Sequence, residues 1–177
     1  PEMMQPITTL SLGQLKIQHD YSYPIRTYSE FKDVDPLSSV LSVLSKNQPG
    51  DTVSIQYLLY PVSNRWQVAG KSFADQTTTA SDGKVTTNPY AQVIKDKVSY
   101  SGFRVGIRLA VQAPSKARSY QYLVEIANAF SSFNNPSGNS LGLSRPYLWQ
   151  KARLRNAMVT RSRFFMPQHQ YLNVAEL

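Results

Sequence analysis

Residues 103–111, with the sequence FRVGIRLAV, decide the fold of this chain. The odd-numbered residues of this stretch are all apolar, whereas Arg104 and Arg108 stand at even-numbered positions. Such alternation is typical of a β-strand that turns one face to a core. Residues 52–60 (TVSIQYLLY) alternate in the same way. We therefore predict that these two strands pair as the central hairpin of a sheet, with residues 62–102 inserted at its tip.

Two helices are marked by capping residues that precede apolar side chains at helical spacing. Asp35 and Pro36 supply an N-cap and a first helical residue for a helix near 36–46. Ser115 caps a longer helix near 116–133, which carries a continuous apolar stripe. Both stripes need a sheet to cover them, so we expect the two helices to pack on the same face.

Two weaker strand signals complete the predicted sheet. Residues 7–18 have an extended pattern, and residues 141–143 fit a short edge strand. The secure elements then run strand, helix, strand, twice over, which favours a ferredoxin-like split βαβ sandwich. We predict an α+β fold with a mostly antiparallel four-stranded sheet and helices on one face.

The inserted segment at about 62–102 shows little periodicity. Its middle, residues 75–88, is polar and rich in threonine, as in loops. A short helix is expected between Pro89 and Val98. We treat residues 1–177 as a single domain with a loop insertion at this place.

The last third of the chain contains one more predicted helix. Pro146 can open this helix, which runs to about Thr160. Beyond it, residues 163–166 and 171–174 have the pattern of extended segments, separated by Pro167.

The composition argues against most kinds of catalytic site. The chain of 177 residues has no cysteine, which excludes disulfides, thiolate metal sites and cysteine nucleophiles. Its two histidines, His19 and His169, are read as surface or capping residues, so no metal site is expected. The glycines form no GxxxxGK[ST] motif of the kind that holds a nucleotide phosphate. We expect no enzyme activity in this chain, no cofactor and no small-molecule substrate.

The charge is distributed unevenly along the chain. The net charge is +8, and all of it comes from residues 101–177, where ten basic residues face two acidic ones. Residues 126–175 contain no acidic residue at all. A field of one sign attracts polyanions or an acidic protein face. Three partners stay open at this point, namely an acidic protein, an anionic lipid surface and nucleic acid, beside the alternative of a solvated basic surface without a partner.

Six arginines are the candidate contact residues for such a partner. Two lie on the predicted open face of the sheet, and four lie in the acid-free stretch: Arg104, Arg108, Arg153, Arg155, Arg161 and Arg163. Arginine suits interfaces because its planar guanidinium bonds two oxygens at once and loses its water readily.

Several stretches together carry a family resemblance. They are Ile25-Arg-Thr-Tyr28, the helix region from Val34 to Lys46, the strand from Val53 to Val62, and Gly102–Leu109 with the helix that follows it. This pattern resembles the N-terminal accessory domain of type IV secretion coupling ATPases of the FtsK/HerA-like class, prominent in Saccharibacteria and other Patescibacteria.

The resemblance implies a setting as well as a fold. It implies a non-catalytic accessory or assembly domain, located in the cytoplasm at the inner face of the membrane. Its partners would be a downstream ATPase domain or neighbouring subunits. The closing residues 172–177 resemble the linker into that ATPase domain, so we expect residues 164–177 to be a linker. The alternative function is a basic nucleic-acid-binding module.

Overall fold

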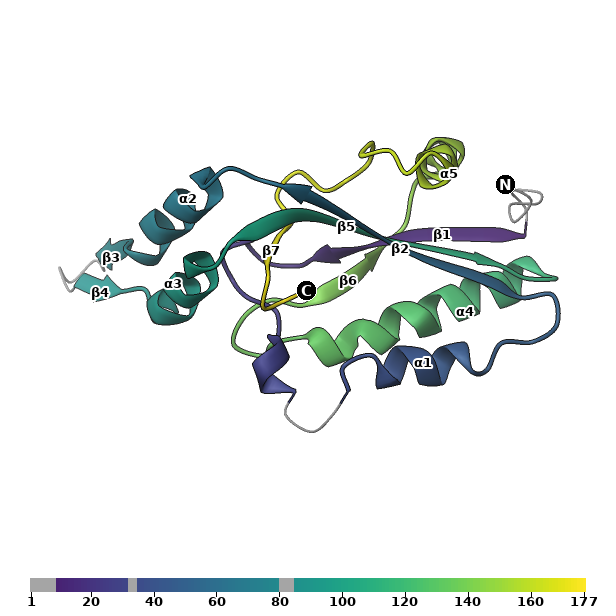
Figure 1. The fold of residues 1–177 in the computed structure, drawn as a ribbon, viewed down its shortest axis with the longest axis horizontal. Helices are drawn as coiled ribbons and strands as arrows, with labels where there is room; N and C mark the ends of the chain where they lie inside the picture. The colour runs from purple at the N-terminus through teal and green to yellow at the C-terminus, as the bar shows by residue number, and fades with distance from the viewer. Residues whose placement is uncertain (1–8, 32–34, 80–84) are drawn as a thin grey trace.

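The computed structural model describes residues 9–31, 35–79 and 85–177. The chain forms an α+β domain around one antiparallel sheet of five strands (Figure 1). The sheet strands are β1 (Leu10–Ile17), β2 (Thr52–Pro61), β5 (Gly102–Gln112), β6 (Leu141–Ser144) and β7 (Tyr171–Asn173). The helices are α1 (Ser38–Leu44), α2 (Arg65–Ala74), α3 (Ala91–Ser99), α4 (Lys116–Ala129) and α5 (Lys151–Val159). Short 3-10 turns lie at Tyr28–Glu30, Phe130–Phe133 and Leu148–Gln150.

The two strands that the alternation pattern identified do pair with each other. β2 runs antiparallel to β5 along its whole length, from Thr52 opposite Gln112 to Pro61 opposite Phe103. The four longer strands lie in the order β2-β5-β1-β6, and all of their pairings are antiparallel. The prediction of four strands is wrong by one, because β7 pairs with the first residues of β5. β5 is therefore the central strand of the sheet.

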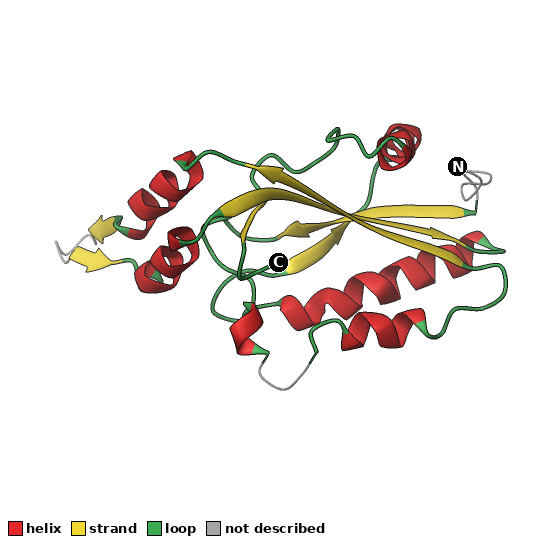
Figure 2. Ribbon diagram, viewed as in Figure 1, coloured by secondary structure: helices red, strands yellow, loops and turns green. Residues whose placement is uncertain are grey.

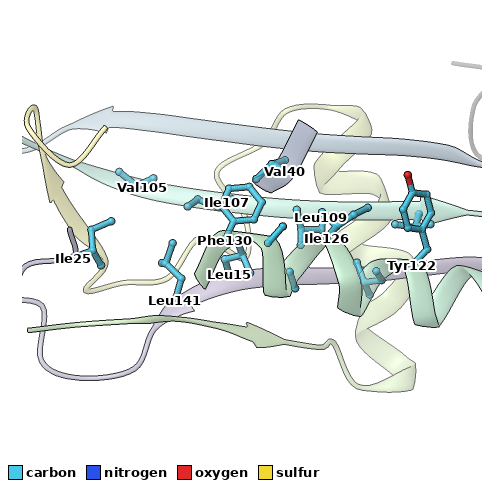
Figure 3. Close-up of a cluster of buried hydrophobic side chains, with 14 of the residues drawn as sticks. Leu15, Ile25, Val40, Val105, Ile107, Leu109, Tyr122, Ile126, Phe130 and Leu141 are labelled. Atoms are coloured by element: carbon cyan, nitrogen blue, oxygen red, sulfur yellow. The ribbon is translucent and has the colours of Figure 1, made fainter. Parts of the chain in front are cut away.

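One face of the sheet is covered by α1 and α4, as predicted (Figure 2). Figure 3 shows this core, in which side chains of β5 such as Ile107 and Leu109 meet Ile126 and Phe130. Ser115 caps α4 by accepting a hydrogen bond from the Arg118 backbone N–H. The Tyr122 hydroxyl donates to the Val43 carbonyl at 3.2 Å and so ties α4 to α1.

The opposite face of the sheet is also covered, which corrects the prediction of helices on one face only. α5 lies across this face in Figure 1, over β1 and β5. Leu154 and Met158 of the helix pack with Leu10, Leu12 and Ala110 to form a second, smaller apolar cluster. An amphipathic helix placed after a short edge strand can reach either face, so the sequence pattern did not decide between them.

The predicted loop insertion is instead a helical arm that extends from one end of the sheet (Figure 1). Helices α2 and α3 pack against each other, and two short strands, β3 (Thr77–Thr79) and β4 (Val85–Thr87), pair beyond them. A Cβ on Gly70 would come within 2.6 Å of Val98, so glycine permits the close approach of the helices. Part of the segment 75–88 lies outside the described residues.

The segment expected to be a linker is part of the fold. Leu172 and Asn173 are buried in β7, and Glu176 is 5 % exposed. The Glu176 carboxylate pairs with Lys97 of α3 at 3.2 Å, and both side chains are inaccessible to solvent. Residues 171–176 therefore bind the base of the arm to the sheet. The sequence indicated an extended segment at 171–174 but did not show that this segment pairs with β5.

Candidate functional site

The fold separates the six predicted contact arginines, and the expectation for Arg108 is wrong. Arg108 is 0 % exposed, because α5 and the turn after it cover this part of the sheet. Its guanidinium donates to Gln56 Oε1 at 3.2 Å, to the Ala157 carbonyl at 3.0 Å and to the Ser162 carbonyl at 2.8 Å. It also donates to the Phe164 carbonyl. Burial lowers the pKa of Arg108. This arginine fixes α5 to the sheet and faces no partner.

The other five arginines differ in how much of each side chain reaches solvent. Arg104 is half-buried, opposite Tyr60 of β2 and Tyr171 of β7. Arg153 and Arg163 are exposed, as is Arg161, whereas Arg155 is half-buried. Residues two apart in an α-helix point about 200° apart, so α5 turns Arg153 and Arg155 to different sides.

A different set of cations surrounds a groove beside the sheet. The groove has a volume of about 660 Å³ and lies at the first half of β1, between the starts of α4 and α5. Three basic residues line it, and they come from three separate places in the chain: Lys116, Arg145 and Lys151. Ser11 and Leu12 of β1 also line it. We refer to this site as the basic groove.

The basic groove forms at this place because β6 is short. β6 pairs with β1 only from Gln14 to Ile17. After Ser144 the chain leaves the sheet and passes from the edge of β1 toward α5 on the other face (Figure 1). Arg145 and Tyr147 in this crossing therefore line the groove together with Lys116 of α4.

Aromatic rings accompany the cations of the basic groove. The Arg145 guanidinium lies over the Tyr120 ring at 4.7 Å from its centroid, which holds the cation at the groove. Tyr147 and Trp149 stack in nearly parallel planes, at 2° and 6.3 Å between centroids. Both rings are largely exposed, at 71 % and 66 %, and Leu148 between them is 83 % exposed. Such an exposed apolar cluster marks an interaction site more often than plain surface.

All charged side chains that line the basic groove are positive. Its lining contains no Asp or Glu. Lys116 and Lys151 are the first residues of α4 and α5, so the positive ends of two helix dipoles add to the cationic field. None of the three cations takes part in the ion pairs formed within residues 9–31, 35–79 and 85–177. The groove is thus suited to bind an anionic ligand.

None of the three groove cations is among the six arginines that the sequence predicted as contact residues. A local signal exists for two of them, because the run from Arg145 to Lys151 (RPYLWQK) lies in the acid-free stretch and contains two aromatic residues. Lys116 and Tyr120 are more than twenty residues earlier in the chain, and only the packing of α4 beside β1 brings them to the groove. No local signal in the sequence could have identified these two residues.

No group of three His, Asp or Glu side chains that could hold a metal ion occurs in the described part of the chain. His169 stacks on Tyr21, with ring centroids 6.2 Å apart. Among the described helices, none has both the length and the apolar character that crossing a bilayer requires.

The described residues form a small α+β domain with a groove lined by three basic residues. A family model described as a domain of unknown function (DUF8128) matches residues 4–163. The chain therefore belongs to this DUF8128 family. No curated protein and no solved structure matches the chain.

Proposed function

We propose that this chain is a non-catalytic accessory domain of a secretion- or conjugation-type ATPase, where it serves assembly or guides a substrate. The observation that carries the proposal is the exposed cluster of Tyr147, Leu148 and Trp149 beside the cations of the basic groove. Interfaces are rich in aromatic residues and arginine. The setting comes from the resemblance, with the inner face of the membrane and neighbouring subunits as the proposed surroundings.

The strand arrangement supports the finer fold assignment that belongs to this proposal. The order β2-β5-β1-β6, with α1 and α4 as the two connecting helices, supports a split βαβ sandwich. We propose a ferredoxin-like domain that carries two additions, the helical arm between β2 and β5 and the C-terminal segment with α5 and β7.

The open reading frame that encodes the chain provides the first test. The proposal predicts a GxxxxGK[ST] nucleotide-binding motif downstream of Leu177, because the ATPase activity must reside there. A downstream sequence without any such motif contradicts the ATPase setting.

The full-length protein provides the second test. The double variant Tyr147→Ser/Trp149→Ser should reduce its assembly into oligomers, measured by mass photometry, and lower its ATP hydrolysis. Tyr28→Ser is the matched control, because Tyr28 is 80 % exposed and does not line the groove. Normal assembly of the double variant contradicts a docking role for this cluster.

A second candidate function is favoured by the charges of the same site. Three cations around a groove without any carboxylate would suit a basic nucleic-acid-binding module. In that case the exposed Arg153, Arg161 and Arg163 would extend the contact along α5 and the turn after it. An anionic lipid surface would use the same exposed arginines, and its binding is tested with phosphatidylserine vesicles.

A further inference from the structure

We propose that the basic groove binds single-stranded nucleic acid, with phosphates at Lys116, Arg145 and Lys151 and a base stacked on the Tyr147–Trp149 pair. This inference rests on the second candidate function and is independent of the ATPase setting. It specifies which strand form is bound and which residues do the binding.

Lys116, Arg145 and Lys151 are arranged so that one extended anionic chain can contact all three. They line one groove and come from α4, from the segment after β6 and from α5, and not from a single exposed helix. A phosphate chain that follows the groove can therefore meet them one after another. Single-strand-binding proteins combine such a cationic groove with aromatic platforms for bases.

The aromatic residues decide between single and double strands. Tyr147 and Trp149 contact each other on one side, and their high exposure leaves ring surface open to a ligand. In a duplex the faces of the bases are already stacked, so a ring on the protein surface has no base face to meet. In a single strand the base faces are accessible, and stacking on an aromatic ring accepts any base.

The same rings argue against an acidic peptide as the ligand. Carboxylates could bind the cations of the groove, but acidic side chains have no aromatic ring to stack on Tyr147 or Trp149. A ligand that contacts both the cations and the two parallel rings must carry anionic groups and aromatic groups in alternation. A nucleotide chain has this chemistry.

The chain contains a built-in reporter for the test. It has two tryptophans, and Trp66 is 5 % exposed whereas Trp149 is 66 % exposed. Oligothymidylate of about ten nucleotides, within the length that one small domain covers, should quench the Trp149 fluorescence at about 50 mM salt. Anisotropy of the labelled oligonucleotide gives the affinity in the same buffer.

Variants of the groove then locate the binding. Tyr147→Ser should weaken binding about tenfold, the effect of losing one stacked base. Lys116→Glu should weaken it as well. Matched controls are Tyr28→Ser and Lys71→Glu, because both residues are exposed and lie outside the groove, Lys71 on α2 of the arm. Neither control should change the affinity.

Four outcomes overturn the inference. They are no binding at low salt, binding that Tyr147→Ser does not weaken, equal affinity for a duplex of the same length, and equal affinity for polyglutamate. The last result would assign the groove to an acidic protein. If the oligonucleotide fails to bind while Tyr147→Ser/Trp149→Ser still disrupts assembly of the full-length protein, this inference fails and the accessory function stands.

Discussion

Buried and exposed cations of this domain have opposite roles, and the contrast is clearest between Arg108 and the basic groove. Arg108 is inaccessible and its guanidinium is bonded to three backbone carbonyls and Gln56. Lys97 is buried with Glu176 as its partner and also donates to the Tyr23 carbonyl. In the basic groove, by contrast, Lys116 and Arg145 are exposed and Lys151 is half-buried, with no carboxylate in the lining.

The comparison shows that the surroundings of a basic residue in the fold decide whether it stabilises the structure or is available to a ligand. The charge pattern of the neighbouring sequence does not decide this. Arg108 is buried without an acidic partner because the carbonyls at the end of α5 form the negative end of the helix dipole. Lys116 and Lys151 stand at helix starts, where a cation is unfavourable. Placing cations there adds nothing to the fold and favours an anionic ligand.

The largest effect is expected for the buried ion pair. Burial lowers the pKa of Lys97 and raises the pKa of Glu176, so each charge depends on the other inside the protein. Lys97→Met leaves the carboxylate buried alone and should cost about 3–5 kcal/mol of unfolding free energy, measured by urea denaturation.

The double variant Lys97→Met/Glu176→Gln sharpens this prediction. It should lose clearly less stability than the sum of the two single variants, because no unpaired charge is left behind. Strictly additive losses would mean that the two groups are not coupled, which contradicts the pairing of the C-terminal segment with the arm.

A somewhat smaller effect is expected for Arg108. Arg108→Met removes the charged donor from the carbonyls of Ala157, Ser162 and Phe164 and should cost about 2–3 kcal/mol. Hydrogen exchange should rise in α5 while it stays slow in α4. Arg153→Met on the exposed side of α5 is the control and should change stability by less than about 0.5 kcal/mol. Equal losses in the two variants would refute the structural role of Arg108.

A variant of Arg161 tests whether this exposed arginine lowers the stability of the fold. Its backbone has a positive φ of 52°, a conformation that glycine adopts without strain. Arg161→Gly should therefore raise the unfolding free energy by up to about 1 kcal/mol, measured by thermal denaturation. If the arginine contacts a polyanion, the same variant should weaken binding. A loss of stability would show that the side chain supports the turn.

Much of the fold follows from local patterns, and what does not follow has identifiable causes. The alternation at 103–111 and 52–60 predicted that β5 and β2 pair, and Ser115 predicted the start of α4. The second covered face was missed because Arg108 has the pattern of a solvent-facing residue. Only the carbonyls that surround it in the fold make its burial possible.

The site shows the same limit. Arg145 and Lys151 stand in a recognisable basic and aromatic run, but the groove needs Lys116 and Tyr120 from α4. Their contribution depends on how far β6 extends along β1. That length is set by tertiary packing, which a single sequence does not reveal.

The smallest effect on stability is expected for the cations of the basic groove. The triple variant Lys116→Gln/Arg145→Gln/Lys151→Gln should lose less than about 1 kcal/mol, most of it from the contact between Arg145 and Tyr120. Urea denaturation measures this loss. A loss as large as that of Arg108→Met would place these residues in the structural group.

The most direct measurement is the salt dependence of oligothymidylate binding by the wild-type domain and by this triple variant. Each phosphate neutralised on a single strand contributes about −0.7 to the slope of log K against log salt concentration. Three groove cations should therefore make the wild-type slope about 2 units steeper than that of the triple variant, while both proteins remain folded. Equal slopes would contradict the division between structural and binding cations and would assign the contact to Arg153, Arg161 and Arg163.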